Sequence, residues 1–310
     1  MGSWKNMTWM MGIRRMRTVL AAGCAMAVVA GMAACGSGAS SSQKDSGDGI
    51  AVVASINQWG SVARDLGGDK VEVRSIMTST NVEAHDYEPT SSDIAAFGKA
   101  DVAVVNGADY DSWASKAAAG TKATVVDAAK TDGIKAGDNP HVWFSKDVRE
   151  KTADAITAAY EQAMPEQKDY FEQRHKAWEA REQKVEDKIT AAKAKTEGMP
   201  YAASESVAWY LADDLGMTDA TPSGYRNASA NESEPSPADV KQFVDLLKAG
   251  KPKAFVLNTQ EANDTTKQLE AAASEGKVPV VGLTEQMPKD YDDLTDWMGA
   301  LVDDFTAAVK

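Results

Sequence analysis

From residue 50 onward, short apolar runs alternate with stretches in which apolar residues recur at helical spacing. The predicted strands of the first half lie at residues 50–55, 71–76, 101–106 and 124–126. The predicted helices lie at residues 57–66, 93–99 and 147–163. Strands that alternate with helices in this way favour a parallel α/β layer. We expect Ser91 or Ser92 to cap the second helix, since small hydroxyl side chains accept hydrogen bonds from a first helical turn.

A long stretch from residue 166 to residue 195 contains neither glycine nor proline. As a single helix it would be about 45 Å long, at 1.5 Å per residue. Its Lys-, Glu- and Gln-rich composition leaves a coiled-coil arm open, but its apolar residues are too sparse for a strong heptad seam. A rigid strut between two domains fits this pattern better, and Pro165 suits the first turn of the segment.

The alternation of strands and helices restarts after residue 198. Predicted strands lie at residues 254–257 and 278–283, and predicted helices at residues 206–215, 238–247, 265–274 and 294–309. The predicted fold class is therefore α/β, with two lobes of short parallel-type sheets joined by one long, rigid backbone helix. Ligands of open α/β sheets lie beyond the carboxyl ends of the strands, so we expect a binding cleft between the lobes.

The chain of 310 residues is long enough for two such lobes. We expect an N-terminal lobe at residues 50–164, a connecting helix at 165–197 and a C-terminal lobe at 198–310. The polar, turn-rich stretch 223–237 is expected to be a solvated loop, or a lid that supplies hydrogen bonds to metal-binding histidines.

The first 34 residues have the features of an export signal. Three arginines precede an apolar run of small residues at 19–34, which is shorter than the roughly 20 residues that span a membrane. The run ends at Cys35, and a Ser/Gly-rich stretch follows. This order looks like a bacterial lipoprotein signal, and the alternative is an uncleaved helix that holds two cysteines. We expect cleavage after residue 34, lipidation of Cys35, a flexible tether at 35–49 and anchoring on the extracytoplasmic face of the cell membrane.

The chain is strongly acidic, with 46 Asp and Glu residues against 33 Lys and Arg residues and a net charge of −13. Removing the four positive charges of the signal segment would lower the charge to about −17. Binding to nucleic acid requires Lys and Arg to neutralise phosphates, so this balance argues against a nucleic-acid partner. It suits a protein that handles cations, although many acidic proteins bind none.

Three histidines are present. His85 and His141 lie in predicted loops that precede helices, whereas His175 lies within the long helix and is expected to be solvated. Considered alone, a histidine in a loop is usually an ordinary polar surface residue. The residue types by themselves therefore leave metal binding open.

The surroundings of the two loop histidines carry more information. Residues 85–90 read His-Asp-Tyr-Glu-Pro-Thr, which resembles the His-x-aromatic-Glu-Pro-Ser/Thr signature of the metal-binding receptors of zinc and manganese ABC importers. Residues 140–143, Pro-His-Val-Trp, resemble the second signature of that family. Asn106-Gly107 followed by Trp113 is similar to a third stretch. The resemblance extends over residues 50–310, in order and spacing.

The resemblance implies a metal site in the cleft between the lobes, with four ligands. The first two would be His85 and His141. The third is usually a histidine, but alignment on residues 210–216 places Glu205 there, and the fourth, an acid after the last strand, would be Glu285. Glu205 could instead complement a helix dipole, and Glu285 could be an ordinary loop acid. Two imidazoles and two carboxylates suit zinc, and the carboxylates also suit manganese.

The function implied by the resemblance is that of an extracytoplasmic substrate-binding lipoprotein. It would capture one divalent ion, zinc or manganese, as the transported ligand and deliver it to an ABC permease and ATPase, acting as a monomer. Two alternatives stay open, a surface adhesin on the same scaffold and a zinc-dependent hydrolase. Catalytic zinc needs an open coordination position, and four protein ligands would close this site, so we expect no enzyme.

Overall fold

The computed structural model describes residues 49–81, 87–261 and 263–309. The predicted signal segment, the lipidation site Cys35 and the predicted ligand His85 lie outside the described residues. Within the described ranges, helices of sufficient length and apolarity to cross a membrane are absent.

The N-terminal lobe is built on a parallel sheet with the strand order β2-β1-β3-β4. Its strands are β1 (Ile50–Ile56), β2 (Val71–Met77), β3 (Val102–Val105) and β4 (Thr124–Asp127). The two central strands are nearly all apolar because helices cover both faces of the sheet. Val52 and Ala54 pack with the larger core, and Val53 packs with the smaller cluster on the opposite face.

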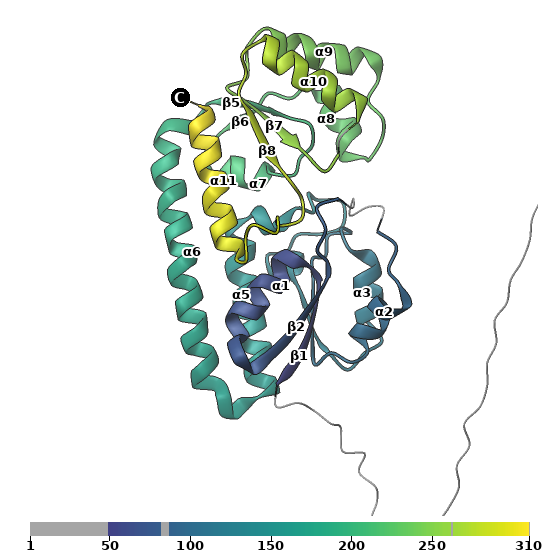
Figure 1. Ribbon diagram of the computed structural model, residues 1–310, viewed down its shortest axis with the longest axis vertical. Helices are drawn as coiled ribbons and strands as arrows, with labels where there is room; N and C mark the ends of the chain where they lie inside the picture. Colours follow the sequence, from purple (N-terminus) through teal and green to yellow (C-terminus); the bar gives the residue numbers. More distant parts are fainter. Residues whose placement is uncertain (1–48, 82–86, 262, 310) are drawn as a thin grey trace, which may run out of the picture. The chain divides into compact units, whose positions relative to one another are not determined.

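In the described part of this lobe, five helices flank the sheet: α1 (Asn57–Gly67), α2 (Ser91–Phe97), α3 (Ser112–Ala118), α4 (Ala128–Thr131) and α5 (Lys146–Ala163). Helices α2 and α3 lie together on one face, and α1 and α5 lie on the other (Figure 1). The apolar spacing of α1 buries Trp59, Val62 and Leu66, so this helix contributes one continuous face to the core.

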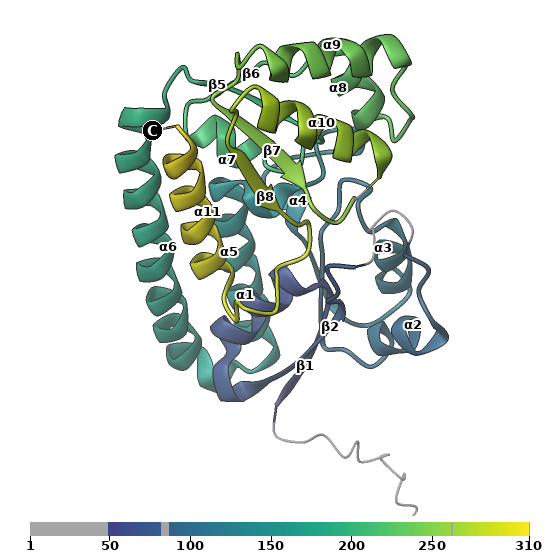
Figure 2. The ribbon, with the colours of Figure 1, turned by 45° about the horizontal axis from the view of Figure 1, so that its top comes forward.

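The C-terminal lobe repeats the same layout, with a parallel sheet in the order β6-β5-β7-β8. Its strands are β5 (Pro200–Ala203), β6 (Thr218–Asp219), β7 (Ala254–Asn258) and β8 (Val280–Leu283). Its helices are α7 (Trp209–Asp214), α8 (Ser223–Ala230), α9 (Pro237–Lys248), α10 (Asp264–Glu275) and α11 (Leu294–Ala308). Helices α8, α9 and α10 cover one face of the sheet, as Figure 2 shows.

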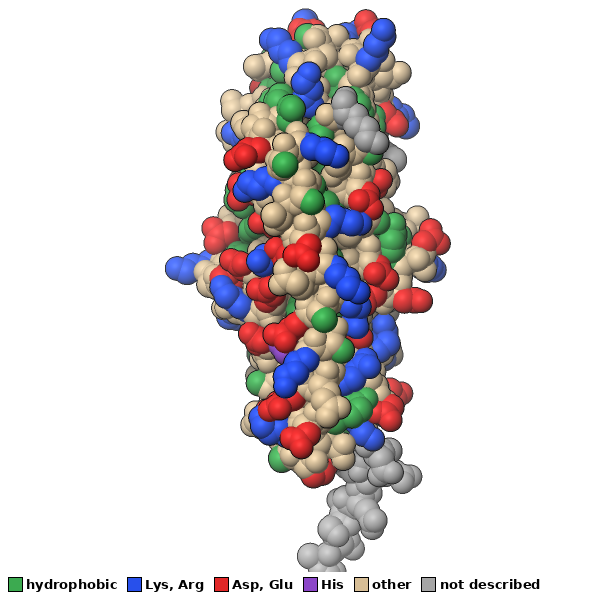
Figure 3. Space-filling model, turned by 90° about the vertical axis from the view of Figure 1, so that its left-hand side faces the viewer, with side chains coloured by type: hydrophobic (Ala, Val, Ile, Leu, Met, Phe, Trp, Pro, Cys, Tyr) green, Lys and Arg blue, Asp and Glu red, His purple; other side chains and the backbone are tan. Residues whose placement is uncertain are grey.

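A long helix, α6 (Lys168–Thr196), connects the lobes after a short 3-10 turn at Pro165–Gln167. It packs against α5 of the first lobe and α11 of the second, so both lobes share one backbone (Figure 1). Lys, Arg, Asp and Glu side chains are interspersed on the side of the molecule that α6 occupies (Figure 3). The predicted fold of two α/β lobes joined by a long helix is confirmed, and the strut interpretation of residues 166–195 accounts for α6 better than a coiled-coil arm.

An ion pair between α5 and α6 is fully buried. The guanidinium of Arg149 donates to Glu182 Oε1 at 2.9 Å from Nε and 2.5 Å from Nη2. A third donor, Nη1, reaches the carbonyl oxygen of Trp143 at 3.2 Å. Charge-assisted hydrogen bonds of this kind satisfy a buried guanidinium, and here they connect the long helix to the loop that contains His141.

Four local predictions were wrong. Helix α2 is capped by Thr90, which forms a capping box with Asp93, and the expected cap residues Ser91 and Ser92 lie inside the helix. Helix α7 begins at Trp209 and not at residue 206, so Glu205 lies in the turn before the helix and does not open it.

The stretch 223–237, expected to be a loop, begins with helix α8. The small polar residues of α8 did not indicate a helix in the sequence. In the structure Tyr225 of this helix packs edge-on against Phe243, with ring centroids 4.8 Å apart. His175 is not solvated either: its side chain is 14% exposed, with Nδ1 2.9 Å from the Thr157 hydroxyl and Nε2 3.2 Å from Asp154. Packing between helices α5 and α6 determines this burial, and residue type alone does not reveal it.

The buried ion pair predicts a large loss of stability on removal of one partner. Glu182→Ala should lower the free energy of unfolding by about 3 kcal/mol, because it leaves the Arg149 charge buried beside fewer acceptors. A matched control is Glu172→Ala on the same helix, which breaks an exposed pair with Lys168 and should cost about 0.5 kcal/mol or less. Urea denaturation measures both variants, and similar losses for the two would contradict the structural role of the pair.

Candidate metal site

Two predicted ligands meet where the lobes face each other. His141 follows β4 and α4 in the first lobe, and Glu285 lies just beyond the carboxyl end of β8 in the second. Their side chains are 6% and 1% exposed, and Nε2 of His141 lies 3.9 Å from Oε1 of Glu285. Zinc binds nitrogen and oxygen ligands at about 2.0–2.2 Å, so one cation between these atoms could contact both.

The imidazole of His141 is held in one orientation by Asn139. The amide oxygen of Asn139 accepts from the His141 backbone N–H at 3.0 Å and lies 2.8 Å from Nδ1. The amide NH₂ of Asn139 donates to the Ser206 carbonyl at 2.8 Å. This hydrogen bond determines that the amide oxygen, and not the nitrogen, faces the His141 ring. Because an amide oxygen only accepts, Nδ1 carries the hydrogen, and a neutral ring then has its lone pair on Nε2. That Nε2 atom is buried and has no hydrogen-bond partner, as expected of an imidazole nitrogen that coordinates a metal ion.

The backbone of the same loop is anchored by Asn106, the asparagine of the predicted Asn-Gly motif. Its Nδ2 donates to the Pro140 carbonyl at 2.8 Å, and its Oδ1 accepts from Trp59 Nε1 at 3.0 Å. From the other lobe, the Tyr210 hydroxyl donates to the Asn139 carbonyl at 2.9 Å. The loop is therefore fixed by contacts from both lobes.

Glu285 is held by donors from both lobes as well. Its Oε2 accepts from the Tyr110 hydroxyl at 2.7 Å, and its backbone carbonyl accepts from Gln58 Nε2 at 2.6 Å. Its Oε1 accepts from Asn258 Nδ2 at 3.2 Å. Burial, together with the neighbouring Glu285 carboxylate, raises the pKa of Tyr110 well above its usual range, so this hydroxyl stays a donor.

Glu205 lies two residues after β5, on the other side of Asn258. Asn258 ends β7, the strand between β5 and β8, and its Nδ2 also donates to Glu205 Oε2 at 2.9 Å. The second oxygen, Oε1, is buried without a hydrogen-bond partner. Burial, together with the nearby Glu261 carboxyl, raises the pKa of Glu205.

A cleft of about 620 Å³ has both His141 and Glu205 in its lining. His141 and Pro140 line it from the first lobe, and most of its wall comes from the second lobe. The acidic residues of that wall are Glu205, Glu232, Glu234, Glu261 and Asp264. An acidic cleft attracts cations and offers oxygen donors along its length.

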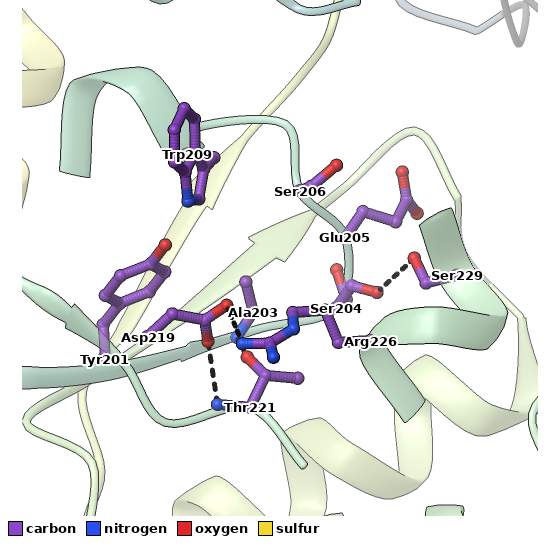
Figure 4. Close-up of a pocket in the computed structure, with 10 residues that line it drawn as sticks. All are labelled: Tyr201, Ala203, Ser204, Glu205, Ser206, Trp209, Asp219, Thr221, Arg226 and Ser229. Carbon is purple, nitrogen blue, oxygen red and sulfur yellow. Dashed lines mark hydrogen bonds and ion pairs between the residues drawn. The ribbon is translucent and has the colours of Figure 1, made fainter. Parts of the chain in front are cut away.

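A smaller hollow of about 160 Å³ lies beside the loop that follows β5. Glu205, in this loop, lines both the hollow and the cleft. Figure 4 shows Tyr201 and Trp209 on one side of the hollow, with Glu205 directed away from Trp209. Arg226 forms an ion pair with Asp219 at 3.2 Å, so the charge of its guanidinium is balanced within the hollow.

The structure thus brings His141 and Glu285 together and connects Glu205 to Glu285 through Asn258, whereas His85 lies outside the described residues. Over residues 49–81, 87–261 and 263–309, His, Cys, Asp and Glu side chains do not gather in a group of three or more that could hold a metal ion. The supporting residues Tyr110, Asn139 and Asn258 were not predicted. Only Asn139 had a signal, since it directly precedes the Pro-His motif.

Comparison with known proteins shows what the chain is similar to. Residues 52–308 match the family model described as zinc-uptake complex component A, periplasmic (ZnuA). The chain is 26% identical over 286 residues to the high-affinity zinc uptake system protein ZnuA of Bacillus subtilis (strain 168), covering 84% of this chain and 87% of that protein. It is 24% identical over 276 residues to the manganese ABC transporter substrate-binding lipoprotein PsaA of Streptococcus pneumoniae, covering 82% and 85%.

The laminin-binding protein Lmb of Streptococcus agalactiae has the same fold. Its solved structure aligns with a TM-score of 0.71 at 23% identity, covering 84% of this chain and 100% of that one. At this identity the likeness concerns the fold.

The contacts of Asn139 predict the tautomer of His141 in the metal-free protein. Nitrogen NMR should show the hydrogen of neutral His141 on Nδ1, and Asn139→Ala should shift the ring toward the Nε2–H form, because the fixed acceptor is lost. His175, which does not contact Asn139, serves as the internal control and should keep its signals. An Nε2–H form of His141 in the unaltered protein would contradict this orientation.

Proposed function

The chain belongs to the zinc-uptake complex component A family, and from this premise we propose that it captures a single zinc or manganese ion outside the cytoplasm for delivery to an ABC permease and its ATPase. Members of this family are metal-binding components of transporters and not enzymes. The observation that carries the proposal is the buried, unpartnered Nε2 of His141, which faces a carboxylate oxygen of Glu285 across the two lobes.

We propose His85, His141, Glu205 and Glu285 as the ligands. Two imidazoles and two carboxylates provide two negative charges against a dication, and four ligands of this kind match a tetrahedral zinc site. The carboxylates also suit manganese, which takes oxygen ligands at higher coordination number. Support for the described part of this set comes from the unpartnered Oε1 of Glu205 and Nε2 of His141.

Metal release is proposed to depend on loops more than on a hinge between the lobes. Helix α6 packs against both lobes, and side chains from both lobes hydrogen-bond across their boundary. A large opening would break all of these contacts at once, whereas movement of the ligand loops would break few.

The relatives PsaA and the manganese-binding protein MntA of Halalkalibacterium halodurans are named lipoproteins. Together with the apolar run that precedes Cys35, this supports a mature protein that starts at Cys35 and is anchored in the cell membrane by lipid. We propose that it acts as a monomer. Adhesion, the alternative function, is tested separately, because loss of metal binding should leave an adhesive surface intact.

Metal capture predicts a stability difference that depends on His141. Zinc at about a thousandfold excess over Kd should stabilise the folded protein by about 4 kcal/mol, since it binds only the folded state. In His141→Ala most of the zinc-induced rise in Tm should disappear. His175→Ala removes a histidine far from the cleft and should keep the full rise.

Thermal unfolding with and without zinc measures this difference, and manganese is titrated in parallel. If His141→Ala kept the rise in Tm shown by the unaltered protein, the proposed ligand set would be wrong.

The proposed anchor predicts that Cys35→Ala abolishes membrane retention. The unaltered protein, expressed in a bacterium with lipoprotein processing, should partition into detergent, and the variant should stay in the aqueous phase because a lipid chain supplies the apolar anchor. Cys24→Ala, within the apolar run, is the matched control and should partition like the unaltered protein. Detergent partitioning of Cys35→Ala equal to that of the control would refute lipidation at this cysteine.

A further inference from the structure

The oxygens of the two site carboxylates are not equivalent. In Glu205, Oε2 accepts from Asn258 Nδ2 at 2.9 Å, and Oε1 has no hydrogen-bond partner. In Glu285, Oε2 accepts from the Tyr110 hydroxyl at 2.7 Å, and Oε1 is the atom that faces His141. Asn258 reaches this Oε1 only at the longer distance of 3.2 Å. Each carboxylate therefore has one oxygen in a short hydrogen bond. The other oxygen faces His141 in Glu285 and is buried without a hydrogen-bond partner in Glu205.

The direction of the Tyr110 hydroxyl is fixed by a chain of amides. The oxygen of Gln260 accepts from the backbone N–H groups of Glu285 and Gln286 at 2.8 and 2.9 Å. Its amide nitrogen must then donate to Gln286 Oε1, which it does at 2.8 Å, and Gln286 Nε2 donates to the Tyr110 oxygen at 2.9 Å. Because that bond uses the Tyr110 oxygen as an acceptor, the hydroxyl hydrogen is directed to Glu285.

The amide of Asn258 is fixed as well. Its Oδ1 accepts from the Gln260 backbone N–H at 3.0 Å, so Nδ2 faces the two glutamates. Its own backbone N–H donates to Ser204 Oγ at 3.0 Å, and the residue is 2% exposed. Asn258 thus lies in the central strand and cannot rotate without breaking several buried hydrogen bonds.

We propose that Tyr110 and Asn258 determine metal specificity by restricting Glu285 and Glu205 to one coordinating oxygen each. This inference rests on the proposed function and deepens it. A carboxylate whose second oxygen is held by a fixed donor contributes one ligand atom, which keeps the coordination number low. Zinc is satisfied by four ligands, whereas manganese favours more oxygen ligands and gains from carboxylates that bind through both oxygens. The two donors therefore favour zinc over manganese as the transported ion.

The test is the ratio of the Kd for manganese to the Kd for zinc, measured by competition with a chelator of known affinity. Zinc binds more tightly than manganese to most protein sites, so a preference of the unaltered protein for zinc is not sufficient support. Tyr110→Phe removes only the hydroxyl, and with it the short hydrogen bond to Oε2 of Glu285. We expect the ratio to fall by about tenfold, the scale of one hydrogen bond to a charged group.

Tyr160→Phe is the matched control. Tyr160 is also fully buried, and its hydroxyl donates to the Ala63 carbonyl at 2.9 Å in the first lobe. This variant loses a buried tyrosine hydroxyl without touching a carboxylate, so it should lose stability but keep the ratio. A role of Tyr110 in folding alone would affect both variants alike.

Asn258→Ala provides a second variant, which removes the donor to Oε2 of Glu205 and the longer contact to Oε1 of Glu285, and it should also lower the ratio. Visible absorption of bound cobalt gives a geometric readout, because four-coordinate cobalt absorbs more strongly than six-coordinate cobalt. The unaltered protein should give the strong spectrum, and both variants a weaker one.

Two outcomes overturn the inference in different ways. If both variants bind metal with a ratio within about twofold of the unaltered protein, the specificity role is wrong and the transport receptor proposal stands. If the unaltered protein binds neither zinc nor manganese, the proposed function fails, and the specificity role fails with it.

Discussion

A buried imidazole nitrogen and a buried carboxylate oxygen lie opposite each other, one from each lobe, and the surrounding structure serves to keep them there. Whenever the His141 ring is neutral, with its hydrogen on Nδ1, the lone pair of Nε2 faces Glu285 Oε1 at 3.9 Å. Two acceptors at this distance do not attract each other, so their placement needs support from elsewhere in the fold. Asn139 orients the ring, Tyr110 and Asn258 hold the carboxylate, and a cation would turn the arrangement from unfavourable to favourable.

The two sheets explain how residues far apart in sequence reach this point. Both have the same parallel strand order, with the second strand in sequence at the edge and the first and third in the centre. In the second lobe this order places the ends of β5, β7 and β8 side by side, and Glu205, Asn258 and Glu285 follow or end these strands. Carboxyl ends of parallel strands commonly form binding sites for this reason.

Much of the fold and part of the site could be predicted from the sequence. The buried strands are recognisable as short apolar runs and the long helix as a stretch without glycine or proline, and the two histidine motifs led to the proposal of His141 and, by alignment, of Glu205 and Glu285. Helix α8 was missed because its residues are mostly small and polar, and its stability comes from the packing of Tyr225. The roles of Tyr110 and Asn258 could not be predicted, since the partners of a single polar side chain follow from the strand order and from the opposing lobe, which the sequence does not give.

The distribution of donors between the lobes has a consequence for how the receptor works as a whole. The predicted histidine ligands belong to the first lobe and the predicted carboxylate ligands to the second, so neither lobe alone would provide a complete set of metal ligands. The first lobe alone would offer two imidazoles and the second lobe alone two carboxylates, and two ligands bind a metal ion more weakly than four. Retention of the ion would then depend on both sides of the interface, and a membrane partner that moves the ligand loops of one lobe by a small distance would release the ion without competing for it chemically.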